Sequence, residues 1–172
     1  MEDDEDVNDD MQNESDQNED NHTEESKVNI DDINVGDIYV FGAYEQDNDK
    51  TNGKEKIEWQ VFAKEGTKIF VISKYGLDAQ PYNTEFVDVT WETCTLRDWL
   101  NDDFINTAFT NAEKAMIPTV TVTADKYPDY ETDPGNDTQD KVFLLSIEEA
   151  AKYFDSDTAR ECEVTEYARV FD

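Results

Sequence analysis

The side chains best suited to chemistry in this 172-residue sequence are carboxylates. Asp47, Asp49 and Thr51 alternate along a segment rich in Asp and Asn, and Glu58 occupies the twelfth position counted from Asp47. Oxygen ligands at this spacing are typical of an EF-hand calcium loop. The glycine that an EF-hand needs at its sixth position comes one residue late, at Gly53. A solvated hairpin loop is therefore the competing interpretation.

A second acidic segment offers the same ligand chemistry at looser spacing. Residues 125–140 are rich in Asp, Pro, Gly, Asn and Thr, a composition typical of a long loop. Its aspartates are Asp125, Asp129, Asp133, Asp137 and Asp140. Hard cations bind such oxygens from many spacings. We predict no cofactor, with calcium as the alternative, for which the candidate ligands are Asp47, Asp49, Asp133 and Asp137.

Catalysis that depends on an imidazole has little support in this sequence. The chain holds one histidine, His22, which lies in a polar acidic segment near the N-terminus. Serine and cysteine nucleophiles need a histidine within hydrogen-bond reach, and histidine-based zinc sites need several. Acidic residues are so abundant that a pair of carboxylates carries no information about catalysis. We therefore expect that the chain is not an enzyme.

Aromatic side chains are the other candidates for a binding site. Tyr82 and Trp91 lie in a segment that contains Pro, Asn and Thr, and we expect them to be the ligand-binding aromatics. Trp59 falls on the apolar face of a predicted strand and Trp99 lies beside a predicted helical stripe, so core packing is the expectation for both.

The two cysteines, Cys94 and Cys162, are too few for a disulfide scaffold or a four-ligand structural zinc site. Two interpretations remain open. Both side chains could be small buried apolar groups, or the two could form a single disulfide.

Charge divides the chain into two parts. The whole carries 44 acidic and 14 basic residues, a net charge of −30, of which the first 27 residues contribute −12. Residues 1–27 are too polar to form a core, so we predict a disordered acidic tail before a domain at 28–172. Such a charge repels nucleic acids and anionic lipids and attracts cations. We expect no nucleic-acid partner.

No segment approaches the roughly 20 apolar residues that a membrane span needs, and no apolar signal-peptide core is visible. We therefore predict no membrane insertion by this chain.

Periodicity places the strands of the domain. Three segments are rich in β-branched and aromatic residues, at 37–42, 57–62 and 68–73. In the second, Ile57, Trp59 and Val61 share one face. These segments predict a three-stranded antiparallel meander. Further strands are predicted at 119–123 and 142–145.

Three helices are predicted in the second half of the chain. The clearest runs from Thr95 to Phe109, with a four-residue repeat of apolar side chains and Thr95 as the expected N-cap. Thr110 and Ser146 each precede a glutamate by three residues, which predicts capping boxes for two more helices. A last short helix is expected at 156–160. Because strands and helices mix without a βαβ repeat, the predicted fold class is α+β.

Five segments resemble an uncharacterised domain family of gut Firmicutes. They are VGDIYVFGAYEQ at 35–46, IEW at 57–59, ISKYGLDAQPYN at 72–83, WETCTLRDWLN at 91–101 and PGNDTQDKVFLLS at 134–146. That family of unknown function is similar to C-type-lectin-like and formylglycine-generating-enzyme-like folds. The resemblance implies the N-terminal part of a lectin-like domain, secreted or attached to the cell surface.

The resemblance also implies that the second half of such a domain is missing after residue 168. We expect an exposed apolar seam on the sheet at Phe62, Phe70 and Val71 as a consequence.

Together these observations predict a non-enzymatic binding or interaction module for a carbohydrate, peptide or protein. One alternative is an enzyme of the formylglycine-generating type, whose copper site would require Cys94 and Cys162 to converge. Another is a truncated structural fragment without activity of its own.

Overall fold

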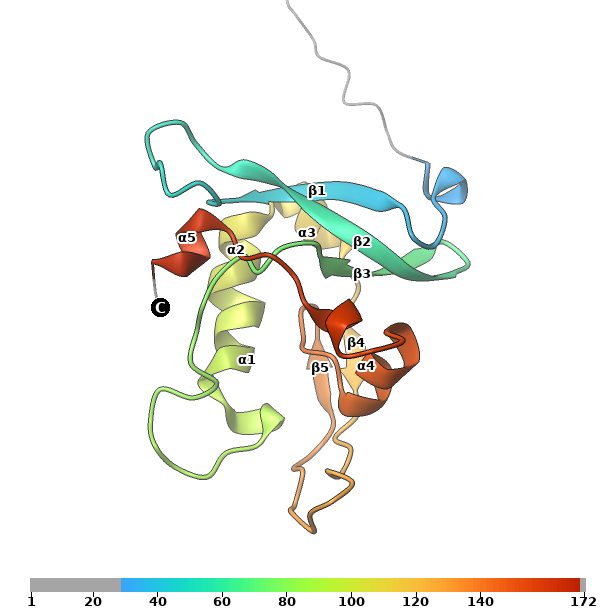
Figure 1. Cartoon of the computed structure of the whole chain (residues 1–172), viewed down its shortest axis with the longest axis vertical. Coiled ribbons are helices and arrows are strands. Elements are labelled where there is room, and N and C mark those ends of the chain that lie inside the picture. Colours follow the sequence, from blue (N-terminus) through green and yellow to red (C-terminus); the bar gives the residue numbers. More distant parts are fainter. Residues whose placement is uncertain (1–28, 171–172) are drawn as a thin grey trace, which may run out of the picture.

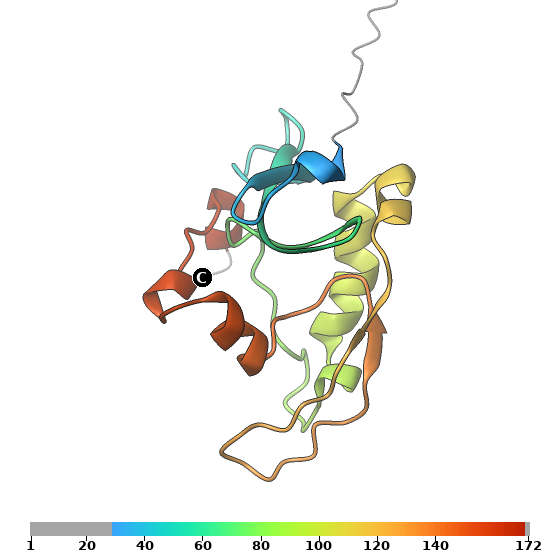
Figure 2. The same ribbon diagram turned by 90° about the vertical axis from the view of Figure 1, so that its right-hand side faces the viewer.

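The computed structural model describes residues 29–170. The predicted acidic tail at 1–27, including His22, lies outside these residues. The described part is a mixed α+β fold with a three-stranded sheet at one end and two long loops at the other (Figures 1 and 2). None of its helices is both long enough and apolar enough to cross a membrane.

The predicted meander is confirmed. Strands β1 (Ile38–Tyr44), β2 (Glu55–Glu65) and β3 (Lys68–Ser73) pair antiparallel in the order β1-β2-β3. The period-two pattern in β2 also holds, because Ile57 and Val61 are fully buried and Trp59 packs against the core.

A bulge at Gly42 lets the sheet meet the helical layer. The register of β1 against β2 shifts between Val40 and Ala43, and Gly42 adopts a φ of 73°. A Cβ at this position would lie 2.5 Å from Cε1 of Phe109 and 2.8 Å from the carbonyl oxygen of Ala108. The Gly42 N–H donates to Oε1 of Glu113 at 3.2 Å. Glycine is therefore required here by both conformation and space.

The main predicted helix is confirmed in extent but not in regularity. It consists of α1 (Thr95–Trp99), a π-helical turn at Leu100–Phe104 and α2 (Ile105–Ala108). Its buried face supplies Phe104, Ile105 and Ala108 to the core, together with Phe109 just beyond its end. A four-residue apolar repeat thus identified the buried side correctly.

The predicted N-cap of this helix was wrong. Cys94 is the N-cap, and its side chain makes no capping bond. The free N–H groups are satisfied by the preceding loop instead: Thr95 N–H donates to Oδ1 of Asn83 at 3.1 Å, and Leu96 N–H donates to the Tyr82 carbonyl at 3.2 Å.

Both predicted capping boxes are confirmed. Thr110 caps α3 (Asn111–Met116) and Ser146 caps α4 (Ile147–Tyr153), each paired with the glutamate three residues later. The remaining helical segments are short, namely η1 (Ile30–Asp32), η2 (Trp91–Thr93), η4 (Thr158–Arg160) and α5 (Glu166–Arg169). The expected helix at 156–160 is thus a single 3-10 turn, and α5 was not predicted.

A second small sheet lies beside the main helix. Strand β4 (Val120–Val122) was predicted, but its partner is β5 (Thr138–Asp140), within the expected loop. The predicted strand at 142–145 is wrong, since this segment pairs with no strand within residues 29–170 and Leu144 is exposed. The physical reason is that buried polar side chains fix β5, whereas the apolar run is held by side-chain packing and, at Val142, by backbone bonds to the Asn101 amide rather than by a strand ladder. Phe143, for example, stacks on Phe70 with ring centroids 6.0 Å apart.

The expected apolar seam on the sheet was also wrong at its two aromatic positions. Phe62 stacks on Tyr153 at 5.6 Å and meets Phe154 edge-on at 5.0 Å. Phe70 contacts the same tyrosine ring at 5.3 Å. Helix α4 and the residues around it therefore cover the surface that was expected to lie open.

We predict that Gly42→Ala destabilises the fold by about 2–5 kcal/mol, since it adds a left-handed alanine and an overpacked contact. Gly66→Ala is the matched control. Gly66 also has a positive φ, of 57°, but nothing lies within 4 Å of the point that an added Cβ would occupy. Denaturant unfolding should give a cost of only about 1 kcal/mol there. Equal costs for the two variants would contradict the close approach at Gly42.

Candidate functional site

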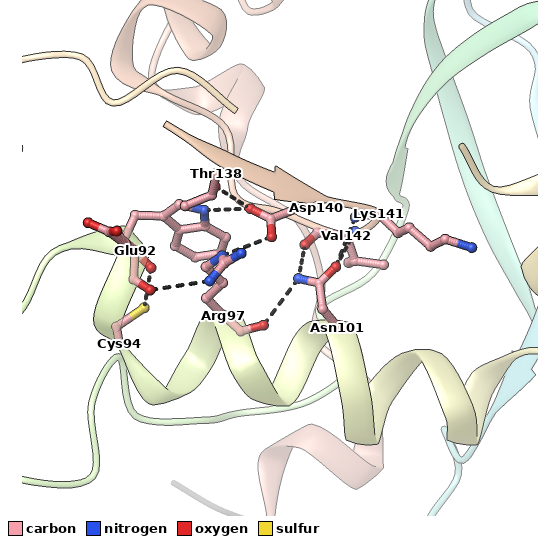
Figure 3. A network of polar contacts seen from close by, with 9 residues as sticks. Glu92, Cys94, Arg97, Asn101, Thr138, Asp140, Lys141 and Val142 are labelled. Carbon is pink, nitrogen blue, oxygen red and sulfur yellow. Dashed lines mark hydrogen bonds and ion pairs between the residues drawn. The ribbon is translucent and has the colours of Figure 1, made fainter. Parts of the chain in front are cut away.

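A buried carboxylate organises the region below the sheet. Asp140, at the end of β5, is 1% exposed. Its Oδ1 accepts from Nε of Arg97 at 2.8 Å (Figure 3). Its Oδ2 accepts from Nε1 of Trp91 at 3.0 Å and from the hydroxyl of Thr138 at 2.5 Å. Each oxygen of this carboxylate is therefore paired, which is the condition for burying a charge at tolerable cost.

Asn101 extends this network from the π-helical turn. Its amide nitrogen donates to the carbonyl oxygens of Arg97 at 3.1 Å and Val142 at 2.8 Å. Its Oδ1 accepts the N–H groups of Lys141 at 2.8 Å and Val142 at 3.2 Å (Figure 3). All four hydrogen-bonding positions of the amide are thus used. The helix and the segment after β5 are held together by this one side chain.

The network also reaches the loop that joins β4 to β5. Arg97 Nη1 donates to the Glu92 carbonyl at 3.2 Å. The Glu92 carboxylate accepts from the backbone N–H of Asn136 at 3.1 Å and from its amide. Gly135 packs against Thr90 so closely that a Cβ would lie 2.7 Å from the threonine hydroxyl. The structure therefore places Trp91, a predicted ligand-binding residue, at the base of the two long loops.

The first long loop, residues 79–90, is fixed at its base and exposed at its tip. Asn83 and Tyr82 accept hydrogen bonds from the first N–H groups of the helix, as described above. A third hydrogen bond runs in the opposite direction, from the Thr84 N–H to Oγ1 of Thr95 at 3.0 Å. Beyond these contacts Phe86 is fully exposed and Val87 is 64% exposed. Tyr82, the other predicted ligand-binding residue, is 45% exposed. Burial of its hydroxyl end, and then the Cys94 thiol beside it, raise the pKa of Tyr82 to about 12.

The second long loop, residues 123–137, also presents aromatic rings. Tyr127 and Tyr130 lie with ring centroids 5.1 Å apart, and both are exposed. Two predicted calcium ligands bond to the backbone of this loop. Oδ1 of Asp133 accepts the Gly135 N–H at 3.0 Å within a turn, and Oδ1 of Asp137 accepts the Ala124 N–H at 2.9 Å across the base of the loop.

Both loops lie at the end of the molecule farthest from the three-stranded sheet, in each of the two views (Figures 1 and 2). We call their exposed apolar side chains the distal surface; its members are Tyr82, Phe86, Val87, Tyr127 and Tyr130. Of these, sequence reasoning identified only Tyr82. The local signal for the others was their position inside loops of turn-forming residues, where an aromatic side chain has little to pack against.

A depression of about 290 Å³ lies between the first loop and the main helix. Its apolar lining includes Pro81, Leu96 and Trp99, and three aspartates also line it, Asp98, Asp102 and Asp103. Trp99 thus packs on the core residue Phe104 and also lines this depression.

The acidic hairpin loop brings together a different set of carboxylates from the predicted one. Oxygens of Glu45, Asp47 and Glu55 all lie within 4.8 Å of one another, close enough to share a cation. Asp49 is not a member, because its Oδ1 accepts the N–H and hydroxyl of Thr51. The EF-hand template missed both glutamates because Glu55 opens β2 across the hairpin from Tyr44, so pairing rather than linear spacing brings them close.

Two carboxylates of this cluster, Glu45 and Asp47, have pKa values that are shifted in opposite directions. Burial, followed by the charges of Glu55 and Asp47, raises the pKa of Glu45. Within the described residues, Oε1 of Glu45 is buried without a hydrogen-bond partner. The pKa of Asp47 is lowered instead, first by the Asp49 N–H and then by the Asn52 amide. A cleft of about 370 Å³ next to Glu45 is lined by Tyr44, Lys50, Gly53, Lys54, Thr107 and Tyr167.

The two cysteines are both free, so the disulfide interpretation is wrong. Cys94 is buried as expected of a small apolar side chain, and its thiol donates to the Trp91 carbonyl at 3.5 Å. Cys162 is exposed, which contradicts the expectation that both are buried.

We predict that Asp140→Asn lowers the free energy of unfolding by about 3 kcal/mol, because it leaves the Arg97 charge without its carboxylate. Arg97 keeps some exposure, which holds the cost near the lower end of the range for buried ion pairs. Hydrogen exchange should also accelerate in both long loops, whose bases depend on this network. Thermal and denaturant unfolding measure the first effect; a cost below about 0.5 kcal/mol would show that the network is dispensable.

We predict that Glu45→Gln raises the melting temperature at neutral pH. A carboxyl whose pKa is raised on folding favours the neutral form, so its contribution to stability is lost as the pH rises through the folded pKa. Glutamine mimics the neutral form and avoids that loss. The gain should shrink towards zero as the pH falls to about 4. A variant less stable than the wild type at neutral pH would contradict the repulsion described above.

Calcium addition tests the sequence-based calcium prediction in the same experiment. If Asp47 and its two neighbours bind this ion, calcium raises the melting temperature of the wild type more than that of Glu45→Gln. Equal responses of both proteins would argue against a calcium site in the hairpin loop.

The comparisons with known proteins give one match. Residues 66–172 match the family described as Domain of unknown function (DUF6273). Searches of curated proteins and of solved structures each found no match. The resemblance seen in five segments between residues 35 and 146 is thus supported from residue 66 onward, and no relationship to lectin-like or formylglycine-generating proteins is shown. The matched region covers more than half of the chain and contains both long loops and the Asp140 network, and the chain therefore belongs to the DUF6273 family of domains of unknown function.

Proposed function

We propose that this domain is a non-enzymatic binding module whose distal surface contacts a peptide or protein. The observation that carries the proposal is the full exposure of Phe86 on a loop whose base is bonded to the start of the main helix. A phenylalanine held in water gives no stability to the isolated domain. Aromatic side chains of this kind are the usual anchors of binding interfaces.

Preorganisation supports this assignment. Three hydrogen bonds join residues 82–84 to the helix at Thr95 and Leu96, so the segment just before Phe86 is ordered without a partner. Binding through such a loop loses less conformational entropy than binding through a free segment. The second loop is fixed in a similar way, through Glu92 and Asn136. The exposed tyrosines of that loop add apolar area at the same end of the molecule.

The described polar groups favour a structural over a catalytic role for the densest network. Asp140, Arg97 and Asn101 are bonded to one another or to backbone groups, and the network links chain segments. An enzyme of the formylglycine-generating type would need Cys94 and Cys162 together. One of these thiols is buried and the other is exposed, and neither is bonded to the other.

We also propose four further properties that the sequence resemblance implies. They are a lectin-like fold, a gut-bacterial source, a position at the cell surface and a carbohydrate as the alternative ligand. Exposed tyrosines at a loop end suit a sugar ring as well as a peptide. A truncated fragment without activity of its own would yield no selected peptide and no sugar ligand.

We predict that Phe86→Ser weakens peptide binding at least tenfold, as expected for an anchor worth more than about 1.4 kcal/mol. The probe is a peptide selected from a phage-displayed random library on the wild-type domain and then synthesised. Its affinity for both proteins is measured by calorimetry. The melting temperature should change little, because Phe86 is fully exposed.

Met116→Ser is the matched control, because it removes another exposed apolar side chain, 62% exposed, from α3 near the sheet. It should bind the peptide like the wild type. Selected peptides that bind Phe86→Ser equally well would show that the distal surface is not the binding surface. A glycan array run in parallel identifies a sugar ligand, which must also depend on Phe86 if the surface is correctly assigned.

A further inference from the structure

The depression beside the first loop has the lining of a binding socket. Its inner lining is apolar, from Pro81 of the loop and Leu96 and Trp99 of the helix. Its acidic lining comes from three aspartates of one helix, Asp98, Asp102 and Asp103. Asp98, Asp102 and Asp103 are all exposed. An apolar lining beside carboxylates suits a ligand with a hydrocarbon stem and a positive head.

The charges of these three carboxylates are not neutralised within the described fold. Over residues 29–170, no ion pair involves Asp98, Asp102 or Asp103. Asp98 lies in the first helical turn, where a negative charge stabilises the helix dipole. That effect fades within one turn, so it does not explain Asp102 and Asp103. Asp102 accepts a hydrogen bond from the Asn106 amide at 2.9 Å, which leaves its charge uncompensated.

The arrangement selects among cationic ligands. A metal ion needs several oxygens that converge on one point. Among residues 29–170, the cluster of carboxylates close enough together to do this contains Glu45, and it does not include the aspartates of the depression. A lysine or arginine side chain needs an apolar wall for its methylene groups and acceptors around its tip. A cation near Trp99 would also gain from the indole ring.

Charge complementarity points to the same partner. The chain has a net charge of −30, and the first loop contributes Glu85 and Asp88 beside Phe86 with no basic residue at 79–90. A positively charged polypeptide is steered to such a surface. An uncharged sugar gains nothing from it.

We infer that this depression is a socket for a lysine or arginine side chain of a polypeptide partner. The inference rests on the proposed function, because it places the socket beside the Phe86 anchor on the same loop. The partner then has an apolar contact for Phe86 and a basic residue that enters between Pro81 and Trp99.

The direct test uses a small probe, so that it does not depend on finding the partner. N-acetyl-arginine amide is titrated into the ¹⁵N-labelled full chain, with N-acetyl-glutamine amide as the uncharged comparison. The indole N–H signal of Trp99 should move with the arginine compound only. No movement, or equal movement with both compounds, would overturn the socket.

The variant for this test is Asp98→Asn with Asp102→Asn and Asp103→Asn. The matched control removes three exposed charges elsewhere, Glu148→Gln with Asp155→Asn and Glu161→Gln. Both triple variants lose the same net charge, so general attraction falls equally in both. The socket variant should bind the probe at least about tenfold more weakly and the control within about twofold of the wild type. Similar losses in both would show that only the overall charge matters.

Failure of this inference and failure of the proposed function give different results. If the selected peptides require Phe86 but bind the socket variant as the control does, the binding surface stands and the socket is wrong. If the arginine probe binds in the socket while peptide binding ignores Phe86, the proposed function is wrong and the socket inference, which depends on it, falls too.

Discussion

The structure depends on the cost of burying one charge. Asp140 lies in the interior with almost no exposed surface, and an ionised carboxylate is stable there only if its oxygens are bonded. The bonds come from three separate parts of the chain: Trp91 in η2, Arg97 in the main helix and Thr138 in β5. Satisfying one side chain thus fixes the relative positions of these three segments.

This constraint allows the loops to be long and still ordered at their bases. Residues 79–90 end next to the network at Trp91, residues 123–137 lead into β5, and Glu92 joins the two regions by its bonds to Asn136. Their tips can then vary or bind without disturbing the core, which lies near the sheet around Ile57 and Phe104. The molecule accordingly separates stability at one end from exposed aromatic surface at the other.

Apolar periodicity was the part of the sequence that predicted structure well. Ile57 and Val61 identified the inner face of β2, and the spacing of Phe104 and Ala108 identified the inner face of the main helix. The errors occur where polar groups decide the structure. β5 is a three-residue strand in which Thr138 and Asp140 are buried and bonded, and although threonine is common in strands, the aspartate is disfavoured there by propensity.

The same reasoning explains why the two acidic clusters behave differently. In the hairpin loop, strand pairing brings Glu45 and Glu55 together, and burial, followed by the charges of Glu55 and Asp47, raises the pKa of Glu45. On the main helix, Asp102 and Asp103 are held at a surface where water and salt reduce the repulsion. The spacing of acidic residues along the sequence cannot distinguish the hairpin cluster from the helix aspartates. The hairpin cluster depends on a contact between paired strands, whereas the exposure of the helix aspartates depends on which face of the helix packs on the core. A chain with a net charge of −30 contains many acidic runs, so the apolar surface beside a carboxylate, as at Trp99, is the more informative signal of binding.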